Sequence, residues 1–277
     1  MEKLTKAQYK KLVKQNFTIG KTEDKKKQQK ATINKDYKLS SDGIYGERIP
    51  LPMYKLHHHK LEIFPDGSVF ASIVGRQGSG KTVQLLSLIP QLNYDSSISQ
   101  IMICSLKVGD PAHDAVQKYC ENTGIRYEFS NDVDDAMDKI EDMVNTKDPH
   151  TYGILIFDDF TNGDRYSSSN QYNKIISTFF CIARGSGFHA IMITQDNTNV
   201  IPLVKTNTNL RIIYPMARKI AVDNAAIDFE FLVSNHTKDE FYKYYKMLIE
   251  KKYSFMVIAN NKVWLDFNDK RGLIRVI

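Results

Sequence analysis

The sequence predicts an α/β fold in which a mostly parallel central sheet is flanked by helices. Three apolar strand patterns carry this prediction, because each of them ends in residues suited to binding a ligand. Residues 68–74 lead into the glycine-rich segment GRQGSGKT, residues 152–157 end at Asp158 and Asp159, and residues 188–194 end at Gln195. Ligands of open α/β sheets bind beyond the carboxyl ends of the strands. We therefore expect these three segments to share one site.

Apolar periodicity and turn residues predict the other elements in order along the chain. Asn131 or Asp132 is expected to cap an acidic helix, and Asn260-Asn261 is typical of the turn in a C-terminal β-hairpin. Further strands are predicted over residues 61–64, 100–105, 126–129, 210–214, 253–258 and 262–267, and helices over residues 82–89, 111–123, 131–144, 172–184, 220–232 and 239–251.

The charge is concentrated at the N-terminus. Residues 1–38 hold twelve lysines and four acidic residues, whereas the whole chain has a net charge of +6, so the remainder is slightly acidic. We predict that residues 1–45 form a basic arm, mobile or ordered by a partner, and that residues 46–277 form one domain. The arm is either a solvated tail or an attractor for DNA or another acidic surface.

The composition favours a protein of a reducing compartment. Cys104, Cys120 and Cys181 are an odd number at wide spacing, which indicates neither a disulfide framework nor a zinc site. His57-His58-His59 would alternate between the faces of a strand and has no partner at ligand spacing, so metal binding there is disfavoured. We expect no membrane-spanning segment, because no run of apolar residues approaches the length of about 18 that such a helix needs.

The segment at residues 75–82 matches the phosphate-binding pattern G-x-x-x-x-G-K-[ST] at every fixed position. Glycines let the backbone wrap closely around a pyrophosphate, so that N–H groups and the next helix N-terminus point at the anion. We expect Lys81 to contact the β- and γ-phosphates of ATP, and Thr82 to bind Mg²⁺. The residues predicted to hold the nucleotide are Gly75, Arg76, Gln77, Gly78, Ser79, Gly80, Lys81, Thr82 and Val83.

The two other strand ends supply the remaining groups of an ATP site. We expect Asp158 to bind Mg²⁺ through a coordinated water, and Asp159 to polarise the attacking water. Gln195 is placed to sense the γ-phosphate, or else only caps its strand.

Four segments resemble the FtsK/HerA superfamily of P-loop ATPases, and within it the viral genome-packaging ATPases of the poxvirus and giant-virus type. They are GRQGSGKT, ILIFDD, ARGSGFHAIMITQ and NLRIIYP, and the resemblance runs from about residue 68 to about residue 214. The resemblance implies a RecA/ASCE-like P-loop fold, the sensor role for Gln195, and a ring in which an arginine reaches the neighbour's ATP. Arg184 and Arg211 are the candidates for that arginine, ahead of Arg76 and Arg218. Many members have Glu where this chain has Asp159.

The resemblance implies an enzyme that hydrolyses ATP and translocates double-stranded DNA into a preformed capsid. Its partners would be DNA bound without regard to sequence, further copies of the chain in a homo-oligomeric ring, and capsid or portal-vertex proteins. It would act in the virion or at the assembly site in the host cytoplasm. Lys107 and Lys205 are candidate DNA contacts or ordinary exposed lysines. The alternatives are a HerA/FtsK-like cellular or plasmid DNA pump or helicase, a P-loop small-molecule kinase, and a capsid-associated protein with a degenerate site.

Overall fold

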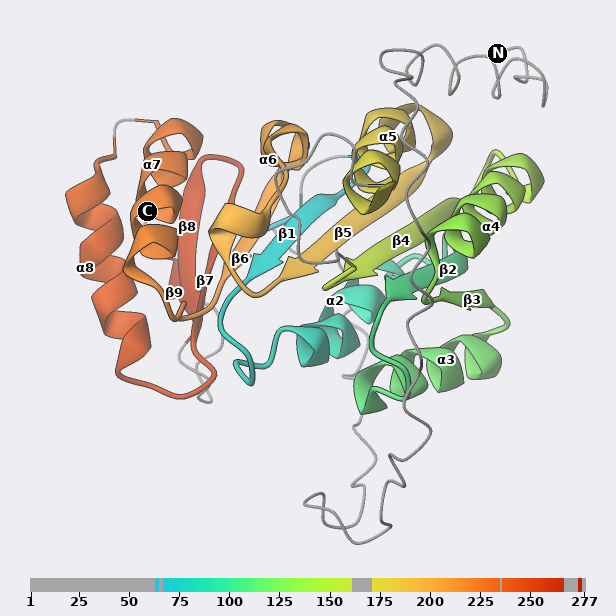
Figure 1. The fold of residues 1–277 in the computed structure, drawn as a ribbon, viewed down its shortest axis with the longest axis horizontal. Helices are drawn as coiled ribbons and strands as arrows, with labels where there is room; N and C mark the ends of the chain where they lie inside the picture. The colour runs from blue at the N-terminus through green and yellow to red at the C-terminus, as the bar shows by residue number, and fades with distance from the viewer. Residues whose placement is uncertain (1–62, 65–66, 161–170, 235, 267–273, 276–277) are drawn as a thin grey trace, which may run out of the picture. The chain divides into compact units, whose positions relative to one another are not determined.

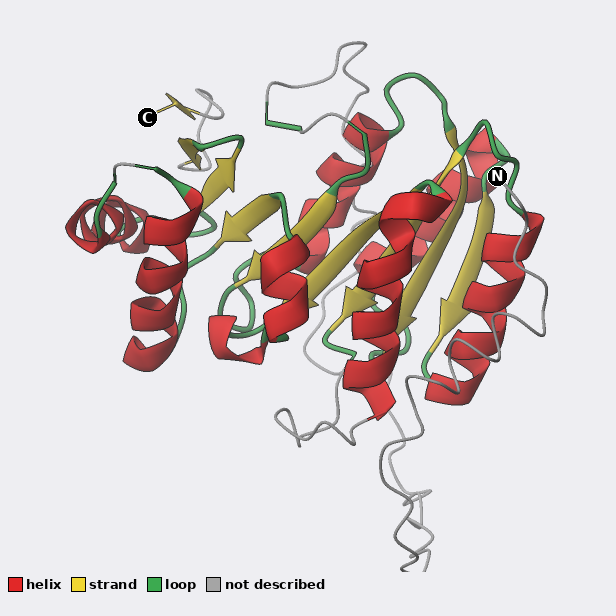
Figure 2. Cartoon of the chain, turned by 90° about the horizontal axis from the view of Figure 1, so that it is seen from above, coloured by secondary structure: helices red, strands yellow, loops and turns green. Residues whose placement is uncertain are grey.

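The computed structural model of the chain describes residues 63–64, 67–160, 171–234, 236–266 and 274–275. Within them, nine strands form one sheet in the order β3-β2-β4-β5-β1-β6-β7-β8-β9 (Figures 1 and 2). The strands from β3 to β6 in this order are parallel, and β7, β8 and β9 extend the sheet antiparallel. Their bounds are β1 Phe70–Val74, β2 Ile98–Ser105, β3 Arg126–Ser130, β4 Tyr152–Asp158, β5 Phe188–Thr194, β6 Leu210–Ile213, β7 Phe255–Ala259, β8 Lys262–Asp266 and β9 Ile274–Arg275.

Helices cover both faces of this sheet, which confirms the predicted α/β class (Figure 1). Helices α2 and α3 pack on one face, and α4, α5, α7 and α8 pack on the other. No helix among the described residues has the length and apolar character that crossing a membrane requires. The helices are η1 Thr82–Gln84, α2 Leu85–Leu92, α3 Pro111–Thr123, α4 Val133–Thr146, α5 Gln171–Ser186, η2 Asn197–Asn199, α6 Pro202–Asn207, α7 Lys219–Leu232 and α8 Lys238–Ile249.

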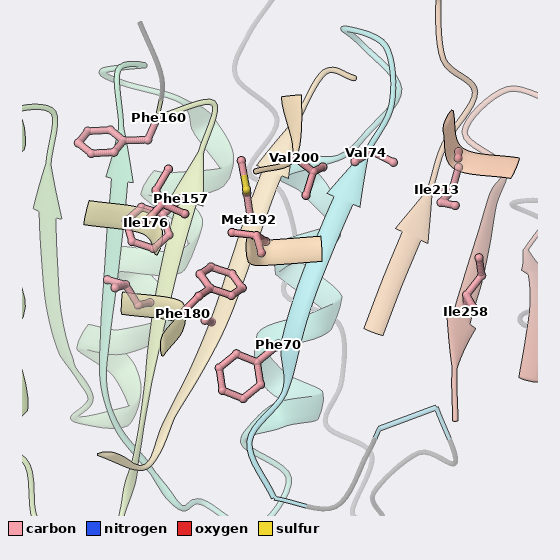
Figure 3. Packing of buried hydrophobic residues seen from close by; sticks show 14 of the residues in the cluster. Phe70, Val74, Phe157, Phe160, Ile176, Phe180, Met192, Val200, Ile213 and Ile258 are labelled. Carbon is pink, nitrogen blue, oxygen red and sulfur yellow. The ribbon is translucent and has the colours of Figure 1, made fainter. Parts of the chain in front are cut away.

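The central strands are apolar on both sides because helices cover both sides. Every residue of β1 and of β5 is buried. On the α5 face, the side chains of Phe157, Phe180 and Met192 lie together between the strands and the helix (Figure 3). Full burial of an apolar side chain of this size contributes about 2 kcal/mol to folding. The core therefore holds the ends of β4, β5 and β1 in fixed positions.

Local capping explains where several helices begin and end. Helix α3 starts at Pro111, with the Asp110 carboxylate accepting a 2.9 Å hydrogen bond from the Ala112 N–H, and it ends before Gly124 in the left-handed conformation (φ 70°). Asp132 caps α4, which settles the choice between Asn131 and Asp132.

The predicted C-terminal β-hairpin is present as β7 and β8. Asn260 and Asn261 form its turn with φ of 50° and 59°, the positive values that a two-residue type I′ turn needs. Asn tolerates this conformation better than most residues, because its short side chain can bond locally.

Some expectations differ from the structure or fall outside it. Ile63 and Phe64 lie in a turn or bend and not in the predicted strand. The segment after Gln195, expected to be a loop, contains η2 and the short helix α6. The predicted arm at residues 1–45 and the three consecutive histidines lie outside the described residues, as does the boundary at residue 46.

Candidate functional site

The carboxyl ends of β1, β5 and β4 lie next to each other, because β5 is between the other two strands. The phosphate loop follows β1 and the carboxylate pair follows β4. Both are tied to β5, since the Gly75 N–H donates to Thr194 O at 3.3 Å and the Asp159 N–H donates to Ile193 O at 2.9 Å. The three segments singled out in the sequence therefore meet at one edge of the sheet.

The phosphate loop depends on its glycines. Gly78 and Gly80 have φ of 72° and 98°, which few other residues adopt without strain. At Gly75 the limit is space, because a Cβ there would overlap Cβ of Tyr214. The backbone can thus follow the tight path that brings N–H groups toward an anion.

The Lys81 ammonium lies across this loop. It is buried and donates a 3.0 Å hydrogen bond to the carbonyl oxygen of Arg76, and burial lowers its pKa. Ser79 Oγ is also buried, and it has no hydrogen-bond partner among the described residues. Arg76, Gln77 and Val83 are exposed. A buried hydroxyl without a partner is costly, so Ser79 favours a ligand that bonds it.

Asp158 is fully buried and is held by three side chains from three elements. Its Oδ2 lies 3.1 Å from Thr82 Oγ1 and 3.0 Å from His113 Nε2, and its Oδ1 lies 3.4 Å from Lys107 Nζ. Burial alone would raise the pKa of Asp158, but the hydrogen bond from His113 and the charge of Lys107 lower it. The carboxylate is therefore ionised at neutral pH.

The residues expected to bind Mg²⁺ fit that ion. Thr82 and Asp158 offer hard oxygen donors that already lie within hydrogen-bond distance of each other. Mg²⁺ in nucleotide sites is held by one or two such groups together with substrate phosphates and waters.

Asp159 lies beside this pair in a strained backbone conformation, with φ of 49°. Its Oδ2 accepts a 3.3 Å hydrogen bond from Gln195 Nε2 and lies 2.8 Å from Lys107 Nζ. Non-glycine residues with positive φ cluster at functional sites, where the surrounding structure enforces them. The structure thus joins Asp159 directly to the residue expected to sense the γ-phosphate.

Lys107 and Lys205, the two candidate DNA contacts, each form ion pairs with acidic residues of this chain. Lys107 follows β2 and contacts both Asp158 and Asp159. Lys205, on α6, forms a 3.0 Å ion pair with Asp228. These ion pairs give both lysines roles within this chain, and their contact with DNA stays a prediction.

Arg211, one of the two arginines expected to reach a neighbour's ATP, is buried within its own chain. Its Nη1 donates to Asp228 Oδ2 at 2.8 Å and its Nη2 donates to Lys205 O at 3.0 Å. Successive residues of β6 point to opposite faces of the sheet. Arg211 therefore lies on the same face as Ile213, which α7 covers, and not on the face that α2 covers. Asp228 also pairs with Lys205 at 3.0 Å, so Arg211 belongs to a network of charges within this chain.

The other arginines are placed differently. Arg184 lies in α5, and its side chain is outside the described ones. Arg218 bonds Asp196 at 2.6 Å and Thr198 at 2.9 Å, yet 54% of its side chain is exposed. Of the described candidates, Arg76 and Arg218 reach the surface near the site and Arg211 does not.

Sequence reasoning missed His113. It is one turn into α3, its Nε2 contacts Asp158, and its Nδ1 is buried with no hydrogen-bond partner among the described residues. An ionised carboxylate can only accept, so His113 Nε2 carries the proton in this contact. The sequence signal that could have found His113 was a polar residue at a core position of the otherwise regular helix α3.

No protein-family model matches the sequence, and no curated protein matches it significantly. Among solved structures, the chain is similar to the genome packaging NTPase B204 of Sulfolobus turreted icosahedral virus 2. The complex with sulfate has a TM-score of 0.52 at 15% identity, over 73% of this chain and 96% of that one. This chain has the B204 fold. The resemblance inferred from the motifs is thus confirmed at the level of the fold.

Two further B204 structures give the same result. The complex with AMPPCP has a TM-score of 0.50 at 16% identity, over 71% of this chain and 96% of that one. B204 described as the DNA-packaging ATPase of Sulfolobus turreted icosahedral virus has a TM-score of 0.50 at 16% identity, over 73% and 98%. The B204 fold therefore spans almost the whole of the relative and most of this chain.

Proposed function

We propose that this protein is an ATPase that translocates double-stranded DNA and packages a viral genome into a preformed capsid. The observation that carries the proposal is the meeting of Lys81, Asp158 and Asp159 at one edge of the sheet. The B204 fold supports it, because B204 is a genome packaging NTPase of Sulfolobus turreted icosahedral virus 2.

Each side chain has a distinct task in hydrolysis. The loop N–H groups and Lys81 bind and orient the phosphates. Thr82 and Asp158 would hold Mg²⁺, which would supply positive charge next to the phosphoryl group. Asp159 orients the attacking water and takes its proton, while Gln195 links that carboxylate to the position of the γ-phosphate.

The proposal includes a homo-oligomeric ring in which an arginine of one subunit contacts the ATP of the next. Arg184 and Arg211 are the candidates, and Arg211 also pairs with Asp228 within its own chain. DNA would be contacted through its phosphates, so affinity should be independent of sequence and should fall with salt. Capsid or portal-vertex proteins would be the remaining partners.

We further propose that the protein acts in the virion or at the viral assembly site in the host cytoplasm. The three cysteines are free, which suits a reducing compartment. Cys104 and Cys120 are buried, and burial raises the pKa of Cys120 to about 12, so this thiol is unreactive at neutral pH.

The test is ATP hydrolysis by the purified full chain, with and without long double-stranded DNA of several sequences. Lys81→Ala is the inactivating variant, and Lys118→Ala, an exposed lysine on α3, is the matched control. Stimulation by every duplex, lost in Lys81→Ala and kept in Lys118→Ala, supports a DNA motor. Hydrolysis that ignores DNA while phosphate passes to a small acceptor would replace the proposal with a kinase.

A further inference from the structure

Lys107 is placed where a divalent cation would be needed. Its Nζ lies 2.8 Å from Asp159 Oδ2 and 3.4 Å from Asp158 Oδ1, so one ammonium spans the pair of adjacent carboxylates. Lys81, the other lysine of the site, donates to the carbonyl of Arg76 instead. Among the described residues, Lys107 is therefore the ammonium that forms ion pairs with both acids.

The backbone around Lys107 holds it at this position. The Lys107 N–H donates to Ser105 Oγ at 3.2 Å, and that hydroxyl donates to the carbonyl oxygen of Asp158 at 2.8 Å. At the far end of the loop, Asp110 caps α3. The loop is thus anchored at both ends, while the long Lys107 side chain, 40% exposed, can move away from the acids without breaking these anchors.

Two cations cannot share these oxygens closely. An ammonium and a divalent ion on the same carboxylate repel each other, and the repulsion is strong because Asp158 is shielded from water. The two adjacent carboxylates repel each other when no cation is bound, so they bind either Lys107 or the divalent ion.

We infer that Lys107 is a positioning residue that competes with the divalent cation for Asp158 and at the same time holds Asp159. The inference rests on the proposed function, because it concerns the metal site of the ATPase. While Lys107 holds Asp159 Oδ2, that oxygen is a poor proton acceptor. Departure of Lys107 therefore both opens the metal site and frees the base, so that hydrolysis is restrained until Mg²⁺ and nucleotide enter together.

The test is Mn²⁺ binding to the full chain without nucleotide, measured by the electron paramagnetic resonance signal of free Mn²⁺. The variants are Lys107→Met, Lys107→Arg, and the matched control Lys118→Met, which removes an exposed lysine from α3. We expect Lys107→Met to bind Mn²⁺ at least about tenfold more tightly, a change equivalent to about 1.4 kcal/mol. Lys107→Arg and Lys118→Met should resemble the wild type.

A second variant assigns the binding to this site. Asp158→Asn added to Lys107→Met should abolish the tighter binding. Equal Mn²⁺ affinity in wild type and Lys107→Met, or no binding by either, would overturn the inference. Neither readout needs ATP hydrolysis or DNA, so failure here is distinct from failure of the proposed function, which the hydrolysis assay decides.

Discussion

The Thr82 hydroxyl lies 3.1 Å from the Asp158 carboxylate, and this hydrogen bond joins two motifs that are 76 positions apart in the sequence. His113 bonds the same carboxylate oxygen from a third element. Asp158 is thereby fixed in orientation before it meets a metal ion, which is how supporting residues tune metal sites.

His113→Ala should weaken the metal site without removing a predicted ligand. We expect the Mg²⁺ concentration for half-maximal ATP hydrolysis to rise by about 10- to 100-fold, the usual effect of losing a residue that orients a ligand. His150→Ala, at an exposed position, is the control. An unchanged Mg²⁺ requirement in a folded His113→Ala protein would show that Asp158 does not need this support.

Asp159→Asn should separate catalysis from binding. Loss of a general base lowers the rate by about 10²- to 10⁴-fold, while the phosphate loop and its affinity for nucleotide are left in place. Hydrolysis rates and the binding of a fluorescent ATP analogue would be measured together. Asp159→Asn hydrolysing at the wild-type rate would remove Asp159 from the mechanism and leave water activation to another group.

Asp228→Asn should destabilise the fold through Arg211. It leaves a buried guanidinium without its counter-ion, a change that costs about 3 kcal/mol in comparable pairs. Urea unfolding of Asp228→Asn, Arg211→Met and the double variant would give the coupling free energy between the two side chains. Purely additive losses would mean that the pair does not stabilise the protein and would reopen the case for Arg211 as an intersubunit residue.

The same pair predicts a pH dependence of stability. Burial would raise the pKa of Asp228, but the hydrogen bond from Asn197 and the charges of Arg211 and Lys205 lower it. A carboxylate with a lowered folded-state pKa stabilises the fold above the unfolded value of about 3.9, and this contribution is lost as the pH falls further. The stability gap between wild type and Asp228→Asn should therefore be present at pH 6 and shrink as the pH falls below about 4. A stability gap that stays constant over this pH range would contradict the lowered pKa of Asp228.

Much of the fold could be predicted because its signals are local. Helix α3 carries its own start and stop in Pro111 and Gly124, and β5 is a continuous apolar run bounded by Gly187 and Gln195. The phosphate loop and the aspartate pair were recognisable because chemistry restricts their residue types. Helix α6 was missed although Pro202 at its first position was a usable start signal.

The parts that could not be predicted depend on which strands are neighbours. Lys107 reaches the aspartates because β2 pairs with β4, with Ser105 opposite Asp158. No sequence pattern near Lys107 indicates that β2 and β4 are paired. Arg211 likewise has a partner, Asp228 of α7, that no local sequence pattern indicates. Such side chains take their roles from contacts between distant segments.

The position of β5 has a consequence for synthesis of the protein. The chain contains both the phosphate loop and the aspartate pair once residue 159 has been made, but β1 pairs only with β5 and β6 and cannot reach β4 directly. Domains fold as the chain emerges from the ribosome. The two halves of the site are therefore joined only after residues 188–194 emerge, and a nascent or truncated chain ending before them carries both motifs without a binding site.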